Sequence, residues 1–320
     1  MNRLKEIEDE ISRHETFFIA SHRSPEADAI GSQLGLSRAL RGRGKKTVLY
    51  NRDGVPKNLK FLKGTDQVLE PDELDAFMEE VDVGIAVDCS DLDRLGDRGK
   101  GILMNLPTIN IDHHKDNTKF GDINYVRPVA ATTQIIAELI EYMGLEIDEP
   151  IATALYAGII ADTSSFQNEN VSSDLLHSAA ELLEHGADAR SVIINLYERE
   201  PFSKLRLLGE VLSRASFEDG IVWAEITPEV IEKAEATQED TEGIVGKLRS
   251  TEGAEVACLF KQLPDQRVKI SFRSKGKLDV SKVARGFGGG GHKVASGCMV
   301  DGKLDEVEKK VLRDLKERMK

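Results

Sequence analysis

Residues 108–114 read TINIDHH, an apolar run typical of a buried β-strand that ends in an aspartate and two histidines. Two earlier runs have the same form, since residues 16–22 read TFFIASH and residues 83–88 read VGIAVD. Helical stretches separate these runs, and Asp28–Arg41 is the clearest, because its apolar residues recur near helical spacing. The alternation predicts an α/β fold in which a parallel sheet is covered by helices on both faces.

Side chains that bind metals follow three of the predicted strands. His22 follows the first strand, Asp88 ends the second, and Asp112-His113-His114 end the third. Ligands of parallel sheets bind beyond the carboxyl ends of the strands. Hard divalent ions such as Mn²⁺ bind imidazole and carboxylate groups together. The sequence therefore predicts a metal site at this edge of the sheet.

Each of these acidic residues also has a plain structural interpretation when it is taken alone. Asp28, which follows His22 in the segment HRSPEADAIGS, is equally well explained as a helix N-cap. Asp88 alone would be an acid at the surface end of a strand. Asp162 follows an apolar helical stretch, 149–160, and would be a residue that caps that helix. Taken one by one, these residues leave both interpretations open.

Residues 288–297 read GGGGHKVASG. Consecutive glycines let the backbone approach a ligand closely and expose N–H groups, as phosphate-binding loops require. A flexible linker is the alternative, but a linker rarely places His292 and Lys293 directly after the glycines and then resumes apolar residues. We therefore interpret the segment as part of a binding site.

Length and composition limit the class of protein. The chain has 320 residues, a formal net charge of -13 and three scattered cysteines. The length predicts two domains. The acidic balance argues against a long nucleic-acid duplex as partner, because phosphate contacts need a basic face. The cysteines are expected to be small core residues. We expect a cytoplasmic location without membrane association, since the charged N-terminus has no signal-peptide core and no long apolar run occurs.

The pattern changes along the chain and predicts the domain organisation. Residues 1–200 form the metal-binding domain, 201–216 a helical linker, and 217–320 a smaller α+β domain that ends in the helix Leu304–Met319. The metal site is expected in the cleft between the two domains.

Together these motifs resemble the DHH family of phosphoesterases that carry the DHH-associated C-terminal domain. The resemblance covers nearly the whole chain, and its branch is that of the bifunctional oligoribonucleases and 3′,5′-bisphosphate nucleotidases, or nanoRNases. The order of the motifs is diagnostic: a His-x-x-Pro-acid-x-Asp turn, a strand-end Asp, Asp-His-His, a helix-end Asp-Thr, and Gly-Gly-Gly-Gly-His.

The resemblance implies two metal ions, Mn²⁺ by ligand type, bridged by Asp88. The first ion would be held by His22, Glu26 and Asp88, and the second by Asp28, Asp88, His113 and Asp162. The resemblance also implies catalytic roles for His114, on the scissile phosphate, and for Asp88. The substrate would be bound from the second domain by Arg273, Ser274, Gly290, Gly291 and His292.

The implied activity is a two-metal phosphodiesterase that hydrolyses short RNA, linear dinucleotides such as pApA and pGpG, and pAp to mononucleotides. A homodimer is implied as well. A cyclic-dinucleotide phosphodiesterase is an alternative. An exopolyphosphatase or pyrophosphatase is disfavoured by GGGGHKVASG. The family usually has Asp where this chain has Glu26, which leaves a catalytically weakened nucleotide-binding protein as a further alternative.

Overall fold

The computed structural model describes residues 3–74 and 81–319. The chain forms two units that divide between Arg199 and Glu200. The first helix is α1 (Arg3–Arg13), and Met1 and Asn2 lie outside the described residues. Among the helices of the described part, none combines the length and apolar composition needed to cross a bilayer.

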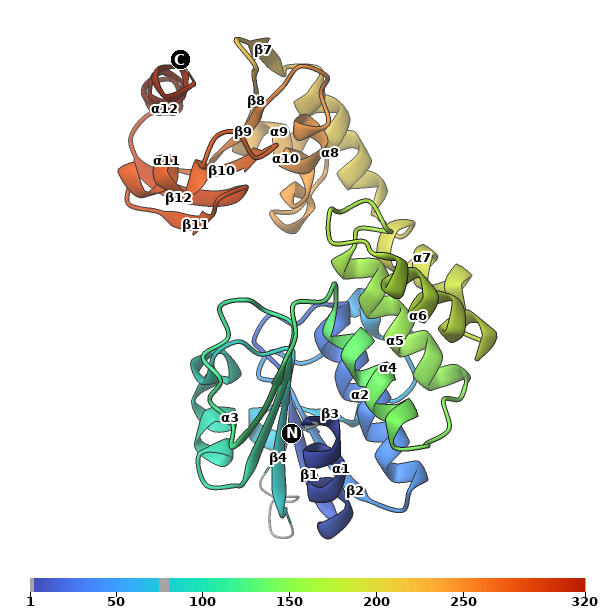
Figure 1. Ribbon diagram of the computed structural model, residues 1–320. Coiled ribbons are helices and arrows are strands. Elements are labelled where there is room, and N and C mark those ends of the chain that lie inside the picture. The colour runs from blue at the N-terminus through green and yellow to red at the C-terminus, as the bar shows by residue number, and fades with distance from the viewer. Residues whose placement is uncertain (1–2, 75–80, 320) are drawn as a thin grey trace. The chain divides into compact units, whose positions relative to one another are not determined.

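The first unit contains a six-stranded parallel sheet (Figure 1). Across the sheet the strands are β3 (Val68–Leu69), β2 (Lys46–Tyr50), β1 (Thr16–Ala20), β4 (Val83–Val87), β5 (Thr108–Asp112) and β6 (Ile123–Val126). The strand order reverses between β1 and β4, as in doubly wound folds. The apolar runs of the sequence predicted β1, β4 and β5. They missed β3, which is very short, and β6, whose residues are only partly buried.

Alternate residues of the strands point into two separate cores. Phe17 and Ile19 of β1 face the larger core, whereas Phe18 and Ala20 face the smaller one. Figure 1 shows α3 (Gly96–Leu103) on one side of the sheet and the remaining helices on the other. The larger core receives residues from α1, α2 (Ala27–Gly42), α4 (Thr132–Tyr142), α5 (Glu149–Asp162), α6 (Ser173–Glu184) and α7 (Ala189–Tyr197). Short 3-10 helices complete the unit: η1 (Lys57–Leu59), η2 (Thr65–Gln67) and η4 (Leu92–Leu95).

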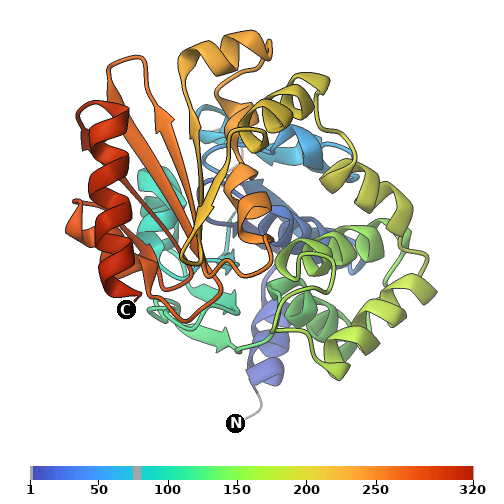
Figure 2. The ribbon, with the colours of Figure 1, turned by 90° about the horizontal axis from the view of Figure 1, so that it is seen from above.

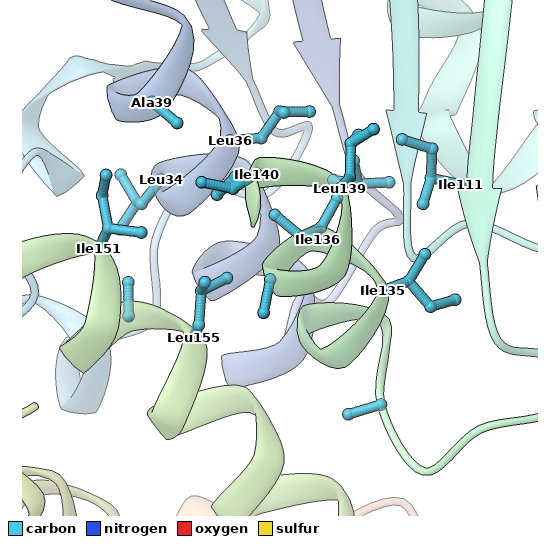
Figure 3. Close-up of a cluster of buried hydrophobic side chains, with 14 of the residues drawn as sticks. Leu34, Leu36, Ala39, Ile111, Ile135, Ile136, Leu139, Ile140, Ile151 and Leu155 are labelled. Atoms are coloured by element: carbon cyan, nitrogen blue, oxygen red, sulfur yellow. The ribbon is translucent and has the colours of Figure 1, made fainter. Parts of the chain in front are cut away.

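Helices α2, α4 and α5 pack through the aliphatic side chains drawn in Figure 3. Gly31 lets α2 approach α5 closely, because a Cβ atom there would lie 2.3 Å from the carbonyl oxygen of Ala154. This packing fixes the start of α2 and the end of α5 relative to each other, and both ends carry predicted metal ligands.

The second unit is built on a six-stranded mixed sheet. Across the sheet the strands are β11 (Gly290–His292), β12 (Ala295–Asp301), β10 (Arg267–Ser274), β9 (Val256–Gln262), β8 (Ile221–Ile226) and β7 (Ser216–Glu218). Figure 2 shows α12 (Leu304–Arg318) alongside this sheet. Helix α12 shares one core with α11 (Val280–Gly286). The other core of this unit is formed with three helices, α8 (Phe202–Leu212), α9 (Pro228–Lys233) and α10 (Ile244–Arg249). The 3-10 helix η5 (Glu239–Thr241) lies next to α8.

The expected fold class, a parallel-sheet domain followed by a smaller α+β domain, is confirmed. Cys89, Cys258 and Cys298 are buried free thiols, which agrees with the predicted core role. Helix α8, in the predicted linker region, packs Leu207 and Val211 into the core of the second unit. The cleft expected between the domains stays a prediction.

Candidate metal centre

Three neighbouring strands deliver the polar residues of the site to one edge of the first sheet. β1, β4 and β5 lie side by side, and their carboxyl ends lead into His22, Asp88 and Asp112-His113-His114. The strand order reverses between β1 and β4, so this edge is the switch point where doubly wound sheets bind ligands. Helices α2 and α5 add Asp28 and Asp162.

Asp88 lies at the centre of this group. Its Oδ2 atom is 3.3 Å from Nε2 of His22, and its Oδ1 atom is 3.5 Å from Nε2 of His113. Oδ1 also accepts a hydrogen bond from Thr132 Oγ1 at 3.1 Å. The residue has φ +53°, a left-handed conformation that aspartate tolerates better than most residues but that still costs free energy. The two oxygens of the Asp88 carboxylate therefore face two different histidines, His22 and His113.

His113 has a defined orientation. Its Nδ1–H donates to the carbonyl of Val129 at 3.3 Å, which leaves Nε2 as the free coordinating atom. Besides Asp88, this Nε2 lies 3.3 Å from Asp162 Oδ2 and 3.9 Å from Asp28 Oδ2. One imidazole nitrogen thus faces three carboxylates, the donor set that a divalent ion prefers.

The carboxylate of Asp28 is fixed by the start of α4. Its oxygens accept hydrogen bonds from the backbone N–H groups of Thr132 at 2.6 Å and Thr133 at 2.8 Å. Helix N-termini favour negative charge. Burial nevertheless raises the pKa of Asp28, and the charge of Asp88 adds to this effect, so that the pKa is about 6. The N-cap role that the sequence left open is not observed, because Glu26 precedes the first turn of α2 and Asp28 lies within it.

Asp162, at the end of α5, experiences the strongest repulsion. Burial and then the charges of Asp28, Asp88 and Glu26 raise the pKa of Asp162 to about 10. Like charges at this spacing cannot all be ionised without a cation between them. The set of Asp28, His113 and Asp162 has one ligand atom from each residue within 4.8 Å of the others. The residues therefore fit a divalent metal ion, which would replace the protons.

His22 has the same kind of orientation as His113. Its Nδ1–H donates to the carbonyl of Arg23 at 2.7 Å, and Nε2 faces Asp88. Burial lowers the pKa of His22, but the hydrogen bond and charge of Asp88 outweigh burial and raise the pKa above its usual value. The guanidinium of Arg94 lies 3.3 Å from Nδ1 of His22. No sequence motif predicted this cation.

His114 is held by Asp112, to which the family resemblance gave no separate role. Its Nδ1–H donates to Asp112 Oδ1 at 2.8 Å, and this bond, against burial, raises the pKa of His114. Asp112 is fully buried and also accepts from the backbone N–H of His113 and from Asn117. Burial favours its neutral form, but these hydrogen bonds outweigh burial and lower the pKa of Asp112. Asp112 therefore positions both histidines.

Glu26 is placed differently from the other predicted ligands. It is exposed, and its side chain makes no capping hydrogen bond to α2. Over residues 3–74 and 81–319, the groups of ligand atoms close enough to share an ion do not include it. Its charge nevertheless contributes to the raised pKa of Asp162, so it acts on the cluster electrostatically.

The predicted substrate residues of the second unit lie on two strands, β10 and β11. Arg273, on β10, lines a pocket of about 320 Å³ together with Lys261, Lys269 and Ser271. Ser274 is buried next to it, and its hydroxyl donates to the carbonyl of Lys293 at 3.5 Å. Burial and then the charge of Arg249 lower the pKa of Arg273, which indicates a half-buried cation near other cations.

The glycine segment forms an exposed edge strand. Gly290, Gly291 and His292 make up β11, which pairs with β12. Gly291 has φ +136°, and a Cβ atom there would lie 2.6 Å from Cα of Ser296, so the close strand pairing requires glycine. Through β12, His292 and Arg273 are both in register with Ala295. They therefore lie on the same face of the sheet.

The fold and this site define a class of protein: a doubly wound α/β domain with a carboxylate–imidazole cluster for divalent metal at its switch point, joined to a second, mixed-sheet unit. Residues 16–159 match the DHH family N-terminal domain, and residues 221–320 match the DHHA1 domain. The chain belongs to the DHH family of phosphoesterases, as the sequence motifs indicated.

Relatives of known name agree with this assignment. The chain is 36% identical to the bifunctional oligoribonuclease and PAP phosphatase NrnA of Thermus thermophilus, over 94% of this chain and 90% of that protein. It is 25% identical to the cyclic-di-AMP phosphodiesterase GdpP of Geobacillus thermodenitrificans, over 88% of this chain but 44% of that protein. A crystal structure of an exopolyphosphatase-related protein from Bacteroides fragilis superposes with a TM-score of 0.90 at 29% identity, covering 99% of this chain and 97% of that one.

Proposed function

We propose that this protein is a metal-dependent phosphodiesterase that hydrolyses short oligonucleotides, linear dinucleotides such as pApA and pGpG, and pAp to mononucleotides. The single observation that carries the proposal is the position of His113 Nε2, which faces the carboxylates of Asp28, Asp88 and Asp162 within 3.9 Å. The similarity to the oligoribonuclease and PAP phosphatase over most of both chains supports the substrate class.

Two divalent ions, most simply Mn²⁺, are proposed for the cluster, with Asp88 shared between them. The first ion is assigned to His22, Glu26 and Asp88, and the second to Asp28, Asp88, His113 and Asp162. The contact of Asp88 with His22 through one oxygen and with His113 through the other supports the shared role. When bound, such ions polarise the phosphate and activate a water molecule. No side-chain nucleophile is then required.

The chain's own residues contribute positioning and charge. Asp112 holds Nδ1 of His114, so we assign the opposite atom, Nε2, to an oxygen of the scissile phosphate. The raised pKa of His114 favours the imidazolium, whose N–H and positive charge suit the charge that develops on that oxygen. His114 and Asp88 are therefore the proposed catalytic residues.

Residues of the second unit are proposed to hold the rest of the substrate. Arg273, with Lys261 and Lys269 in the same pocket, supplies positive charge in a protein whose net charge is -13. The remaining proposed contacts of the substrate are Ser274, Gly290, Gly291 and His292. Exposed backbone N–H groups and guanidinium donors are suited to phosphate oxygens.

The alternatives have less support. The relative named as a cyclic-di-AMP phosphodiesterase is matched over less than half of its length, so cyclic dinucleotides are not favoured. A weakened, nucleotide-binding protein is favoured by one observation, the exposed Glu26 outside the cluster. Turnover measurements separate this alternative from the enzyme.

The test uses purified protein with 5′-pApA, pAp, a 24-mer RNA, cyclic di-AMP and pyrophosphate, each with Mn²⁺ or with EDTA. We expect pApA and pAp to yield AMP only with metal, while the 24-mer and pyrophosphate persist. Absence of turnover in every reaction would overturn the enzymatic proposal. The variant Glu26→Asp then distinguishes a misplaced first ligand, which it would correct, from a binding protein, which it would not.

A homodimer that acts in the cytoplasm is also proposed, on the resemblance to the family alone. Size-exclusion chromatography with light scattering measures the oligomeric state. A mass of 35.3 kDa at micromolar concentration would contradict the dimer.

A further inference from the structure

A pocket of about 430 Å³ lies in the first unit beside the metal centre. Glu26 and Ala27 line one side of it, immediately before Asp28 in the chain, and Ala161 and Ser164 line another side, on either side of Asp162. The pocket is therefore bordered by the neighbours of two proposed metal ligands. A phosphate at the metal centre would bring the attached nucleoside to this pocket.

The walls of the pocket have a composition that differs from that of a phosphate site. Apolar surface comes from Pro25, Pro56 and Tyr197, and polar groups come from Glu26, Asn58 and Ser164. None of the described residues that line it is lysine or arginine. By contrast, the pocket around Arg273 in the second unit is lined by that arginine together with Lys261 and Lys269.

The polar groups of the pocket are available for a ligand. In the described part of the chain, no hydrogen bond engages the amide of Asn58 or the hydroxyl of Ser164. An amide both donates and accepts hydrogen bonds, and so does a hydroxyl. Such groups at the rim of apolar walls fit the edge of a nucleobase.

Two walls are held in place by the fold. The ring of Tyr197 is anchored, since its hydroxyl donates to the carbonyl of Ile160 at 3.2 Å, yet the residue is 45% exposed. Ser164, Ser165 and Phe166 have φ 48°, 58° and 63°, three consecutive left-handed residues. Thr163 supports this turn, because its Oγ1 accepts from the N–H of Phe166 at 3.0 Å. Backbone strain of this kind is concentrated at functional sites.

We infer that this pocket binds the nucleobase on the far side of the scissile phosphate from the nucleotide held by the second unit. The inference rests on the proposed function. The phosphate-binding residues that we assign to one end of the substrate all belong to the second unit, whereas the base pocket belongs to the first. A dinucleotide has a second base to place there. Hydrolysis of pAp releases inorganic phosphate, which carries no second base.

The experiment compares three substrates: pApA, pAp, and a pApA analogue whose second residue is an abasic ribose. Tyr197→Ala and Asn58→Ala are the test variants. Leu183→Ala, on α6, is the matched control, because Leu183 is 46% exposed and does not line the pocket. Loss of base stacking is expected to raise KM for pApA at least about fivefold in Tyr197→Ala. KM for pAp and for the abasic analogue should stay within twofold of wild type.

Equal effects of Tyr197→Ala on pApA and on the abasic analogue, or no effect on pApA, would overturn the inference.

A second measurement separates a failure of this inference from a failure of the proposed function. If the wild type hydrolyses neither pApA nor pAp, the proposed function fails, and adenosine is titrated into the metal-free protein while backbone amide NMR shifts are followed. Shifts at Asn58 and Ser164 that vanish in Tyr197→Ala would sustain the base pocket, and their absence in the wild type would exclude it.

Discussion

The carboxylate of Asp88 lies 3.3 Å from Nε2 of His22, although the two residues follow different strands, β4 and β1. The pairing is possible because these strands are neighbours at the point where the strand order reverses. The other oxygen of Asp88 faces His113. A change at Asp88 therefore acts on both halves of the cluster at once.

Replacing Asp88 by asparagine is expected to reduce metal-dependent turnover of pApA at least a hundredfold, because the neutral amide is a poor shared ligand for two cations. Asparagine also tolerates the left-handed backbone at φ +53°, so the fold should persist. The measurement is kcat with Mn²⁺, accompanied by far-UV circular dichroism. Asp93→Asn, an exposed acid paired with Lys100, is the control and should retain activity. Full activity of Asp88→Asn would disprove the bridging role.

Metal affinity is expected to rise with pH. The pKa of Asp162 is about 10 in the metal-free protein, so its carboxyl carries a proton at pH 7 and must release it when a cation binds. Because binding releases one proton, the affinity for Mn²⁺ should increase about tenfold for each unit by which the pH rises, as long as the pH stays below that pKa. Calorimetry with Mn²⁺ at pH 6, 7 and 8, in buffers of different ionisation enthalpy, measures both the affinity and the protons released. An affinity independent of pH would contradict the coupled carboxylates.

The same raised pKa affects stability without metal. The folded state holds a proton on Asp162 up to pH about 10, whereas the unfolded state releases it near 3.8. The contribution to stability is therefore fully present below the unfolded pKa and is lost progressively as pH rises toward the folded pKa. We expect the Tm of the EDTA-treated protein to fall between pH 5 and 9, and Mn²⁺ to raise Tm more at pH 9 than at pH 5. Asp162→Asn should remove this pH dependence of Tm.

Asp112→Asn is expected to lower kcat about 10–100-fold while the affinity for Mn²⁺ changes less. Asp112 accepts from Nδ1 of His114 and is not itself a proposed ligand, so its loss misplaces His114 and lowers the pKa of that imidazole. The basic limb of the pH–kcat profile should therefore shift to lower pH. An unchanged profile with reduced kcat would point to a purely structural role for Asp112.

Much of this site was predictable because its residues occupy defined positions in local patterns. His22, Asp88 and His113 follow apolar strands, and the rule that such strand ends meet at one edge brings them together. The hydrogen bonds from Thr132 and Thr133 to Asp28 were not predictable, since they join residues more than 100 positions apart without any shared pattern. The exposure of Glu26 depends on the path of a single turn, which residue types do not determine.

The second unit illustrates a similar limit. The sequence predicted Arg273 and the glycines as one binding region, and registration across β10, β12 and β11 does place Arg273 and His292 on one face. The strand pairing of the glycine segment was not predicted, because strand propensity of glycine is low. Close approach of β11 to β12 explains it instead, since a side chain at Gly291 would collide with Ser296.

Arg273→Ala is expected to raise KM for pApA about tenfold or more while kcat changes less, because a charge-assisted phosphate contact is lost. Arg267→Ala is the matched control on the same strand, where the arginine is exposed and paired with Asp265. Initial rates over a range of pApA concentrations measure both parameters. Equal effects of the two variants would indicate a general loss of charge rather than a specific contact.

Gly158→Ala tests how the packing of helices supports the metal centre. A Cβ atom at Gly158 would lie 2.5 Å from the side chain of Thr133 and 2.8 Å from Asp28 Oδ1, so α5 must move or Asp28 must shift. Overpacking of this kind costs about 1–3 kcal/mol. Gly101→Ala, on α3, is the control: nothing lies within 4 Å of its Cβ, and alanine there should stabilise the helix by about 0.5–1 kcal/mol. We expect Gly158→Ala to lower Tm and to weaken Mn²⁺ binding, whereas Gly101→Ala leaves Mn²⁺ binding unchanged. A lower Tm with unchanged Mn²⁺ affinity would show that α5 moves and Asp28 does not. The packing of α5 would then stabilise the fold without affecting the metal centre.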